Sequence, residues 1–419
     1  MMSEQGRAHA LSLQRIAGGL FVIFCTIPWV NFGLNDMDSQ PWPIVFGLFF
    51  LLVIRRPFVE SRFLFTLFWL MLFGIGFGLF FGEARIDFLF MRGVASYLGF
   101  LVILFAFMAF LKKYGFPLRL VVAMNLAWLF AALLEVLIPG VLDHFVSART
   151  TPDRGMTSLA PEPTFFAAYL FFNSWLILAA TSYRPSFWVR ALVAMNVLAI
   201  FGLAMSAMGA LFVVIAAIFV VVSVLMRSSF GARTLIYGAA LLAIIVISYF
   251  VLITHYEGLR ISRIIELAMT VSWIEVARLD GSINSRLANV ILPWHGLWHN
   301  YGVPGGFQSF DSVAQKLLES YGGYFWYNPA GEKILSWMGA FVYELGIFGL
   351  AAIFYIIARL LDGTRRRVFE VILLFVLLFS AIPLAFPIVP LLMAVLYRTK
   401  RTSGVKARLG LVIIHPRLA

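Results

Sequence analysis

Residues 154–172, RGMTSLAPEPTFFAAYLFF, join a charged, proline-rich edge to a long apolar run. The run continues to residue 181 and reaches the roughly 20 residues that an α-helix needs to cross a bilayer. Pro161 fixes its own φ, while Pro163 favours an extended Glu162 and suits the first turn of a helix. The stretch therefore predicts a membrane-spanning helix whose positive end lies beside the Glu162 carboxylate.

The rest of the chain has the same apolar character. Of its 419 residues, 62% are hydrophobic and 12% are charged, whereas soluble domains carry about 25% charged residues. We expect an all-α polytopic integral membrane protein with about twelve transmembrane helices and no cleavable signal peptide. The expected spans are residues 14–33, 41–54, 63–81, 90–111, 118–140, 163–181, 187–204, 206–226, 233–254, 338–359, 367–381 and 383–397.

The positive charges predict which loops face the cytoplasm. If both termini are cytoplasmic, the predicted inside segments hold 22 of the 32 Lys and Arg residues and only four acids. Cytoplasmic loops are enriched in Lys and Arg, so every inside loop follows the positive-inside rule. The net charge of +12 is then a signal of topology and of anionic lipid headgroups, and nucleic acid is not an expected partner.

The predicted outer side carries the longer loops. Spans one to nine occupy residues 1–254 and enclose a loop at 141–162, and a long segment at 255–337 precedes the last three spans at 338–398. A basic tail follows at 399–419. The long segment holds five tryptophans, and residues 257–278 and 309–321 have the periodicity of amphipathic helices. We expect these helices to pack on the outer mouth of the bundle.

The segment RLDGSINSRLANVILPWHGLWHNYGVPGGF, residues 278–307, gathers most of the other candidate residues. Ser282 or Asn284 is expected to cap a helix that carries Arg286, and the final Gly-Val-Pro-Gly-Gly turn is expected to expose backbone N–H groups. Cations, histidines and sugar-sized aromatic faces suit an anionic ligand that bears sugars, although the tryptophans alone also fit an interfacial belt. The candidates for substrate binding are Arg92, Arg278, Asp280, Ser282, Trp294, Trp298, Gly305 and Gly306.

No metal site or cofactor is predicted. His295 and His299 have the i, i+4 spacing of zinc ligands, but a zinc site needs a third ligand, and the single cysteine, Cys25, is far away. Glu344 and Glu135 lie near or within predicted spans, where a carboxylate is costly without a polar partner. Arg92 can snorkel towards the membrane surface.

Three segments resemble the Wzy-type polymerases of O-antigen and exopolysaccharide repeat units. RGMTSLAPEPTFFAAYLFF is similar to their Arg…Glu-Pro-Ser/Thr-aromatic segment, DGSINSRLANVILPWHGL…GVPGGF to their Asp-x-Ser-x-x-x-Arg segment and glycine turn, and YELGIFGL to a Glu-x-Gly-x-x-Gly span. The resemblance covers mainly residues 150–350. It departs from the family pattern at residues 157–160, where Thr-Ser-Leu-Ala replaces the usual Gly-Leu-Phe, and at Pro304 within the glycine turn.

The resemblance implies a GT-C-like, metal-independent glycosyltransferase of the bacterial inner membrane with its site on the periplasmic face. Its substrates would be glycans on undecaprenyl diphosphate, its surroundings membrane lipids, and a chain-length regulator is a further partner to consider. Arginine forks bind diphosphate oxygens, which suits Arg286 and Arg154, and a sugar hydroxyl needs a base, which suits Glu162, His295 or His299.

Three other interpretations stay open. An O-antigen ligase would perform the same transfer onto lipid A core sugar, with a histidine of the long loop as base. A flippase for lipid-linked glycans would need charges along a path through the membrane. An accessory protein of envelope assembly would need no catalysis. Glu162 itself has a purely structural interpretation, as the cap of its helix with Arg154 as partner.

Overall fold

The computed structural model describes residues 4–31, 40–54, 61–81, 86–147, 149, 155–225, 260–307, 309–326, 334–380 and 382–409, and every regular element among them is a helix. The helices are α1 (Glu4–Thr26), α2 (Trp42–Val53), α3 (Ser61–Phe81), α4 (Phe88–Tyr114), α5 (Leu118–Leu137), α6 (Pro163–Ala180), α7 (Phe187–Gly202), α8 (Ala207–Leu225), α10 (Arg260–Thr270), α11 (Trp273–Leu279), α12 (Gly281–His299), α13 (Phe310–Ser320), α14 (Trp337–Glu344), α15 (Gly346–Leu360), α16 (Arg365–Leu378) and α17 (Ile388–Leu409).

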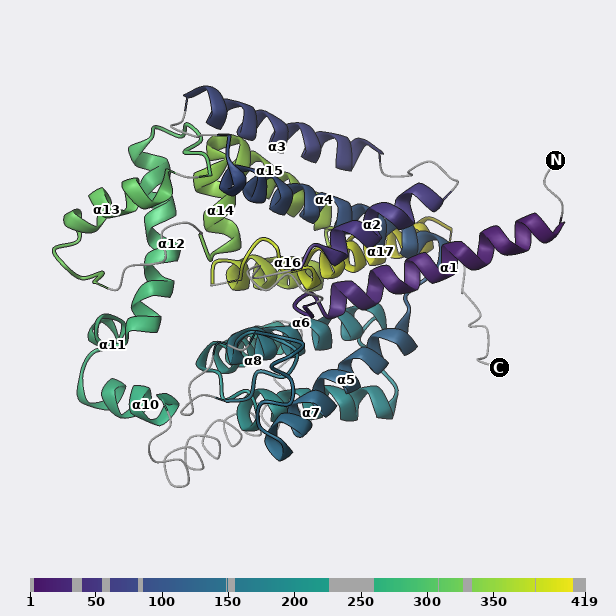
Figure 1. Ribbon diagram of the computed structural model, residues 1–419, viewed down its shortest axis with the longest axis horizontal. Helices are drawn as coiled ribbons and strands as arrows, with labels where there is room; N and C mark the ends of the chain where they lie inside the picture. Colours follow the sequence, from purple (N-terminus) through teal and green to yellow (C-terminus); the bar gives the residue numbers. More distant parts are fainter. Residues whose placement is uncertain are drawn as a thin grey trace.

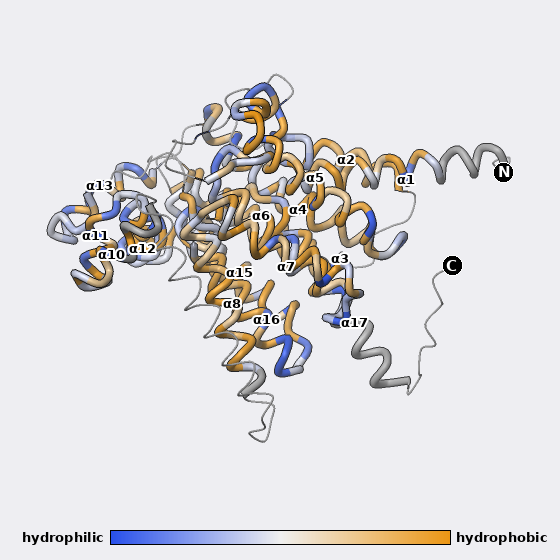
Figure 2. Tube along the Cα trace, turned by 90° about the horizontal axis from the view of Figure 1, so that it is seen from below, coloured by the Kyte–Doolittle hydropathy of each residue, from blue (hydrophilic) through white to orange (hydrophobic). Residues whose placement is uncertain are grey.

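The molecule is a helical membrane protein with one polar extension. Helices α3, α4, α5 and α6 are long and apolar enough to cross a bilayer, and several others are shorter apolar helices. In Figure 1, α1, α3, α4 and α17 run along the longest axis, and α12 runs across one end of them. Figure 2 shows hydrophobic residues along most helices, whereas α10–α13 form a more hydrophilic group at that end. The predicted all-α membrane class is therefore confirmed.

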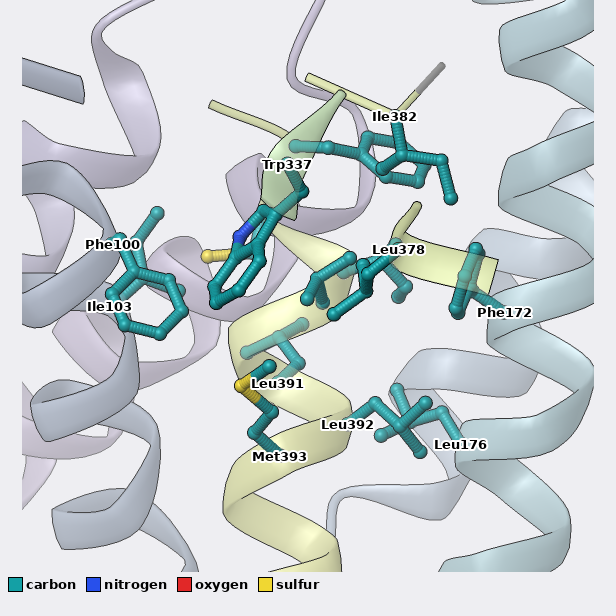
Figure 3. Packing of buried hydrophobic residues seen from close by; sticks show 14 of the residues in the cluster. Phe100, Ile103, Phe172, Leu176, Trp337, Leu378, Ile382, Leu391, Leu392 and Met393 are labelled. Carbon is teal, nitrogen blue, oxygen red and sulfur yellow. The ribbon is translucent and has the colours of Figure 1, made fainter. Parts of the chain in front are cut away.

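Helix α17 forms the centre of the helical body. It packs against α6 on one side and α4 on the other. Figure 3 shows these buried contacts, which involve Leu391, Leu392 and Met393 of α17, Phe100 and Ile103 of α4, and Phe172 and Leu176 of α6. Because lipid is as apolar as leucine, close packing and not water exclusion must hold such helices together.

A buried polar cluster fixes the position of α6 against its neighbours. Asn125 of α5 donates 2.7 Å to Asn196 of α7 and accepts 2.6 Å from Asn173 of α6, and Asn196 also donates 2.8 Å to Ser174. The three asparagines are fully buried. Such hydrogen bonds between membrane helices are worth about 1 kcal/mol each, so the cluster sets the register of three helices.

Contacts between loops divide them into two groups, at opposite ends of the helices. The basic end contains Lys113, which donates to Gln14, and Arg366, which lies 3.8 Å over the ring of Tyr183. At the other end, which we call the loop end, Asn31 N–H donates 2.7 Å to Phe145 O. Among the described residues, Lys113, Tyr183 and Arg366 at the basic end come from segments predicted to be cytoplasmic, whereas Phe145 at the loop end comes from a segment predicted to lie outside.

Several predicted elements differ from the structure. The amphipathic pattern at 257–278 is divided at residues 271–272 into α10 and α11, because Ser272 caps a new helix, while 257–259 lie outside the described residues. The tenth span is divided into α14 and α15 at Gly346, whose φ is +57°. The expected ninth span, 233–254, also lies outside the described residues. Spans seven and eight are separate helices, as expected, since α7 ends at Gly202 and α8 begins at Ala207.

Candidate functional site

The start of α6 holds Glu162 as the sequence predicts. Glu162 is the N-cap residue with φ −142° and ψ 149°, and Pro163 is the first residue of the helix. Glu162 is thus the cap of the helix by position, as its structural interpretation has it, but its half-buried side chain makes no capping hydrogen bond. The expected partner Arg154 lies outside the described residues. Glu162 therefore stands at the positive end of α6 with a carboxylate that the helix does not use.

The segment 155–162 leads into α6 and is fixed by backbone contacts. Met156 N–H donates 2.8 Å to Leu203 O. A Cβ atom at Gly155 would lie 2.1 Å from Ala204 O, so only glycine fits there. Arg149 N–H donates 2.6 Å to Pro161 O, which places a further cationic residue beside Glu162.

A turn within this segment carries a strained residue. Ser158 is fully buried with φ +53°, a left-handed conformation that costs a non-glycine residue about 1–3 kcal/mol. Its hydroxyl donates 2.7 Å to Trp128 O, and its N–H donates 2.7 Å to Glu135 of α5. Thr157 donates to the same carboxylate from its N–H, at 3.0 and 3.2 Å to the two oxygens, and from its hydroxyl at 3.0 Å. The expected polar partner of Glu135 is thus this turn.

Arg286 of α12 reaches the same place from the long loop. The Asp280 side chain accepts 2.8 Å from Ile283 N–H and so caps α12, which corrects the expectation that Ser282 or Asn284 does so. Asn284 is buried instead and binds backbone groups of Ala277, Tyr324 and Trp326. Two residues further on, Arg286 Nη2 donates 2.9 Å to Thr164 Oγ1 of α6.

The hydrogen bond between Arg286 and Thr164 unites two of the three segments that were singled out in the sequence. Thr164 is two residues beyond Glu162, and both Thr164 and Arg286 are half-buried. A carboxylate, a hydroxyl, a guanidinium and a helix N-terminus thus meet at the loop end. Such a group can bind an anion and accept a proton close by.

The two histidines of α12 lie away from this group. His295 is nine residues after Arg286, which corresponds to about 180° around the helix and about 13 Å along it. Its Nδ1 lies 3.1 Å from the hydroxyl of Tyr321, so it faces α13. His299 is exposed at the end of α12. The structure therefore brings Arg286 to Thr164, two residues from Glu162, and leaves both histidines apart from this group.

The remaining candidates of the long loop are dispersed. Arg278 is half exposed and forms an ion pair with Glu275 at 3.4 Å. Ser282 is half-buried in the first turn of α12. Trp294 stacks on Phe379 with 5.5 Å between ring centroids, whereas the side chain of Trp298 is 75% exposed. Trp298 thus remains available to a ligand or an interface, and Trp294 is occupied by packing.

The glycine turn does not expose its N–H groups, contrary to the expectation. Gly305 N–H donates 2.9 Å to Tyr343 O, Gly306 N–H donates 3.3 Å to Glu344 O, and both glycines are buried. A Cβ at Gly305 would lie 2.5 Å from the Tyr343 ring, and one at Gly346 would lie 2.5 Å from Gly302 O. The glycines therefore allow this turn to fit tightly into the break between α14 and α15.

Arg92 and Glu344 form a second charged group behind the glycine turn. Tyr97 of α4 donates 2.7 Å to the Glu344 carboxylate, which confirms that Glu344 has a polar partner. Arg92, one turn before Tyr97, is close enough to stabilise the same carboxylate electrostatically. Phe307, which follows the glycine turn, packs against Tyr97 with 5.7 Å between ring centroids.

Sequence reasoning missed Thr164 and Arg149 as members of the site. Thr164 follows Glu162 in the quoted stretch, but only the fold shows that an arginine binds its hydroxyl. Among the residues that the structure describes, no three His, Cys, Asp or Glu side chains lie close enough to hold a metal ion.

The comparisons with known proteins add no relative to this description. No protein-family model matches the chain, and no curated protein or solved structure is significantly similar to it. The candidate function must therefore be argued from the residues and their geometry.

Proposed function

We propose that the protein is a membrane glycosyltransferase that polymerises glycan repeat units carried on undecaprenyl diphosphate. In this proposal it lies in the bacterial inner membrane, with the loop end facing the periplasm and membrane lipids around the helices. The acceptor is a second lipid-linked repeat unit. A chain-length regulator is a further proposed partner, because polymerisation requires a means of termination.

The observation that carries the proposal is the hydrogen bond from Arg286 to Thr164, two residues from Glu162. It brings a cation and a carboxylate together from two segments that resemble polymerase motifs. Transfer from a lipid diphosphate needs this pair, because a cation must stabilise the leaving diphosphate and a base must accept the proton of the attacking hydroxyl.

The proposed step uses the chain's own residues as follows. A hydroxyl oxygen of the acceptor sugar forms a bond to the anomeric carbon of the donor glycan, and the bond between that carbon and the diphosphate oxygen breaks. The electron pair leaves with undecaprenyl diphosphate, whose charge Arg286 and the N-terminus of α6 stabilise. The Glu162 carboxylate takes the proton. Arg149, whose N–H binds Pro161 O, is a second cation next to this segment.

Purified protein in nanodiscs, supplied with the lipid-linked repeat unit alone and with a metal chelator, tests the proposal. We expect a ladder of lipid-linked products whose formation Arg286→Ala and Glu162→Gln each slow by about 100-fold or more, at unchanged protein level and thermal stability. A ladder from Glu162→Gln at the wild-type rate would remove Glu162 as the base. Transfer only after addition of lipid A core would identify a ligase.

The flippase alternative has its own readout. Protein reconstituted in vesicles with a fluorescent lipid-linked glycan on one leaflet would move the label without changing its mass. If the label crosses the bilayer and no product of higher mass forms, the protein is a transporter and the glycosyltransferase proposal is wrong.

A further inference from the structure

Glu135 is a charged residue that the proposed chemistry leaves unused. It lies near the end of α5 at the loop end, half-buried, and its carboxylate points to the segment that precedes α6. Both of its oxygens accept hydrogen bonds, from two successive backbone N–H groups and one hydroxyl. Two N–H groups that converge on one anion form a nest, a geometry that binds negative charge strongly.

The turn that Glu135 binds is buried and conformationally strained. Thr157 and Ser158 are 2% and 0% exposed, and Ser158 has φ +53°. A non-glycine residue keeps that conformation only where its surroundings over-determine it. The surroundings here are two groups of α5, namely the Glu135 carboxylate and Trp128 O, which accepts from the Ser158 hydroxyl. Helix α5 thus holds the Thr157–Ser158 turn at two points, Trp128 and Glu135.

Little freedom remains between this turn and Glu162. Ala160 N–H donates 3.1 Å to Thr157 O, Pro161 has a fixed φ, and Pro163 keeps Glu162 extended. A shift of Thr157 and Ser158 would therefore be transmitted along four residues to Glu162. The distance from Glu162 to Arg286 depends on that placement, because Arg286 comes from α12 and binds Thr164 within α6, not the segment that precedes this helix.

We infer that Glu135 is a positioning residue: its carboxylate holds the Thr157–Ser158 turn and thereby sets Glu162 opposite Arg286. The inference rests on the proposed function for the role of Glu162, but the contact between Glu135 and the turn stands without it. Glutamine at 135 would keep one acceptor oxygen and place an NH₂ group against N–H donors. Aspartate would keep the charge on a side chain one carbon shorter.

Hydrogen exchange and turnover, measured on the same nanodisc samples, test the inference. In Glu135→Gln we expect the amides of Thr157 and Ser158 to exchange at least about tenfold faster, because charge-assisted bonds to both are lost. We expect kcat to fall about tenfold or more with KM changed less than about twofold, since misplacement affects the reacting geometry and not substrate capture. Glu135→Asp should restore part of both losses. Glu319→Gln, an exposed carboxylate on α13, is the matched control and should change neither quantity.

A double variant tests whether Glu135 acts through Glu162. Glu135→Gln combined with Glu162→Gln should be no slower than Glu162→Gln alone, because a displaced base and an absent base are equivalent. Thr157→Val removes only the hydroxyl that donates to Glu135, and it replaces Glu135→Gln as the test variant if Glu135→Gln does not fold. It should shift exchange and kcat in the same direction by a smaller factor.

Three results would contradict the inference. Unchanged exchange at 157 and 158 in Glu135→Gln would show that the carboxylate does not hold the turn. Faster exchange with an unchanged kcat would remove the positioning role. Additive losses in the double variant would show that Glu135 acts elsewhere. If the wild-type protein transfers no glycan, the proposed function fails, and the exchange measurement still decides whether Glu135 holds the turn.

Discussion

Arg286 Nη2 and Thr164 Oγ1 lie 2.9 Å apart, although 122 residues separate them in the chain. This hydrogen bond connects α12, which runs across the loop end, to the first turn of α6. It makes the long loop part of the same site as Glu162. The rate of the proposed transfer should therefore depend on residues of both α12 and the start of α6.

Substitution of Arg286 should distinguish charge from geometry. Arg286→Ala is expected to reduce transfer by about 10²–10³, the usual loss for a preorganised donor at a developing negative charge. Arg286→Lys should recover only part of this loss, because an ammonium cannot form two parallel bonds to phosphate oxygens. The rate of product formation from the lipid-linked repeat unit measures both. Lys316→Ala, an exposed cation on α13, is the comparison variant, and equal losses from Lys316 and Arg286 would indicate a general effect of charge.

The histidines of α12 should be dispensable for transfer. His295→Ala and His299→Ala are each expected to change the rate less than about threefold, because His295 faces Tyr321 and His299 is exposed at the helix end. His295→Ala should lower thermal stability slightly, since one hydrogen bond contributes about 1 kcal/mol. A loss above about 100-fold from either variant, with the protein folded, would make that histidine the base and favour the ligase interpretation.

Gly305 should tolerate no side chain. Gly305→Ala places a Cβ about 2.5 Å from the Tyr343 ring, and such overpacking typically costs about 1–3 kcal/mol. We expect a lower yield and a lower unfolding temperature in detergent. Gly76→Ala in α3 is the matched control, because nothing lies within 4 Å of its added methyl group. Equal stability of the two variants would contradict the tight seating of the glycine turn.

The basic end should show a dependence on acid pH through Asp362. Burial alone would raise the pKa of the Asp362 carboxyl, but hydrogen bonds from Thr364 and the charge of Arg367 outweigh it and hold the pKa below 3.8. A lowered folded-state pKa contributes stability that is present above the unfolded pKa and is lost as pH falls through the folded one. Asp362→Asn should therefore lower the unfolding temperature at pH 7, by at most about 1 kcal/mol in free energy.

The same pair of proteins should converge in acid. Below the lowered pKa both carry a neutral group at position 362, so the difference in unfolding temperature should begin to shrink as pH falls below about 3.8 and should disappear below the lowered pKa. A difference that stays constant from pH 7 to pH 3 would show that the side chain matters through packing and not through its charge.

The sequence predicts local features of this protein well. The length of the apolar runs gives most helices, and the two prolines give the extended Glu162 at the start of α6. Both features are encoded within a few residues, so no knowledge of the fold is required. The sequence also predicts that Glu344 and Glu135 have polar partners, although it does not say which ones. A carboxylate without such a partner is costly in free energy in an apolar setting.

Features that depend on distant segments were not predictable. The φ of +57° at Gly346 follows from Gly302 O lying against it, and the paired N–H groups of Gly305 and Gly306 follow from the end of α14. A glycine-rich stretch looks the same in sequence whether its amides bind a ligand or another helix. Likewise, the choice of Thr164 as the acceptor for Arg286 requires the path of α12 across the bundle.

The packing of residues 302–306 against the end of α14 also determines when this part of the protein can fold during synthesis. Every candidate residue from Arg92 to Gly306 leaves the ribosome before Tyr343 and Glu344, whose carbonyls receive the glycine amides. Chains grow at about 5–20 residues per second, so residues 302–306 lack their partners in α14 for seconds after they are synthesised. A nascent chain that stops before residue 343 holds all of these candidate residues but lacks the two carbonyls at the end of α14 that accept from Gly305 and Gly306. The packing of the glycine turn is thus completed only once the segment that follows the long loop has been synthesised.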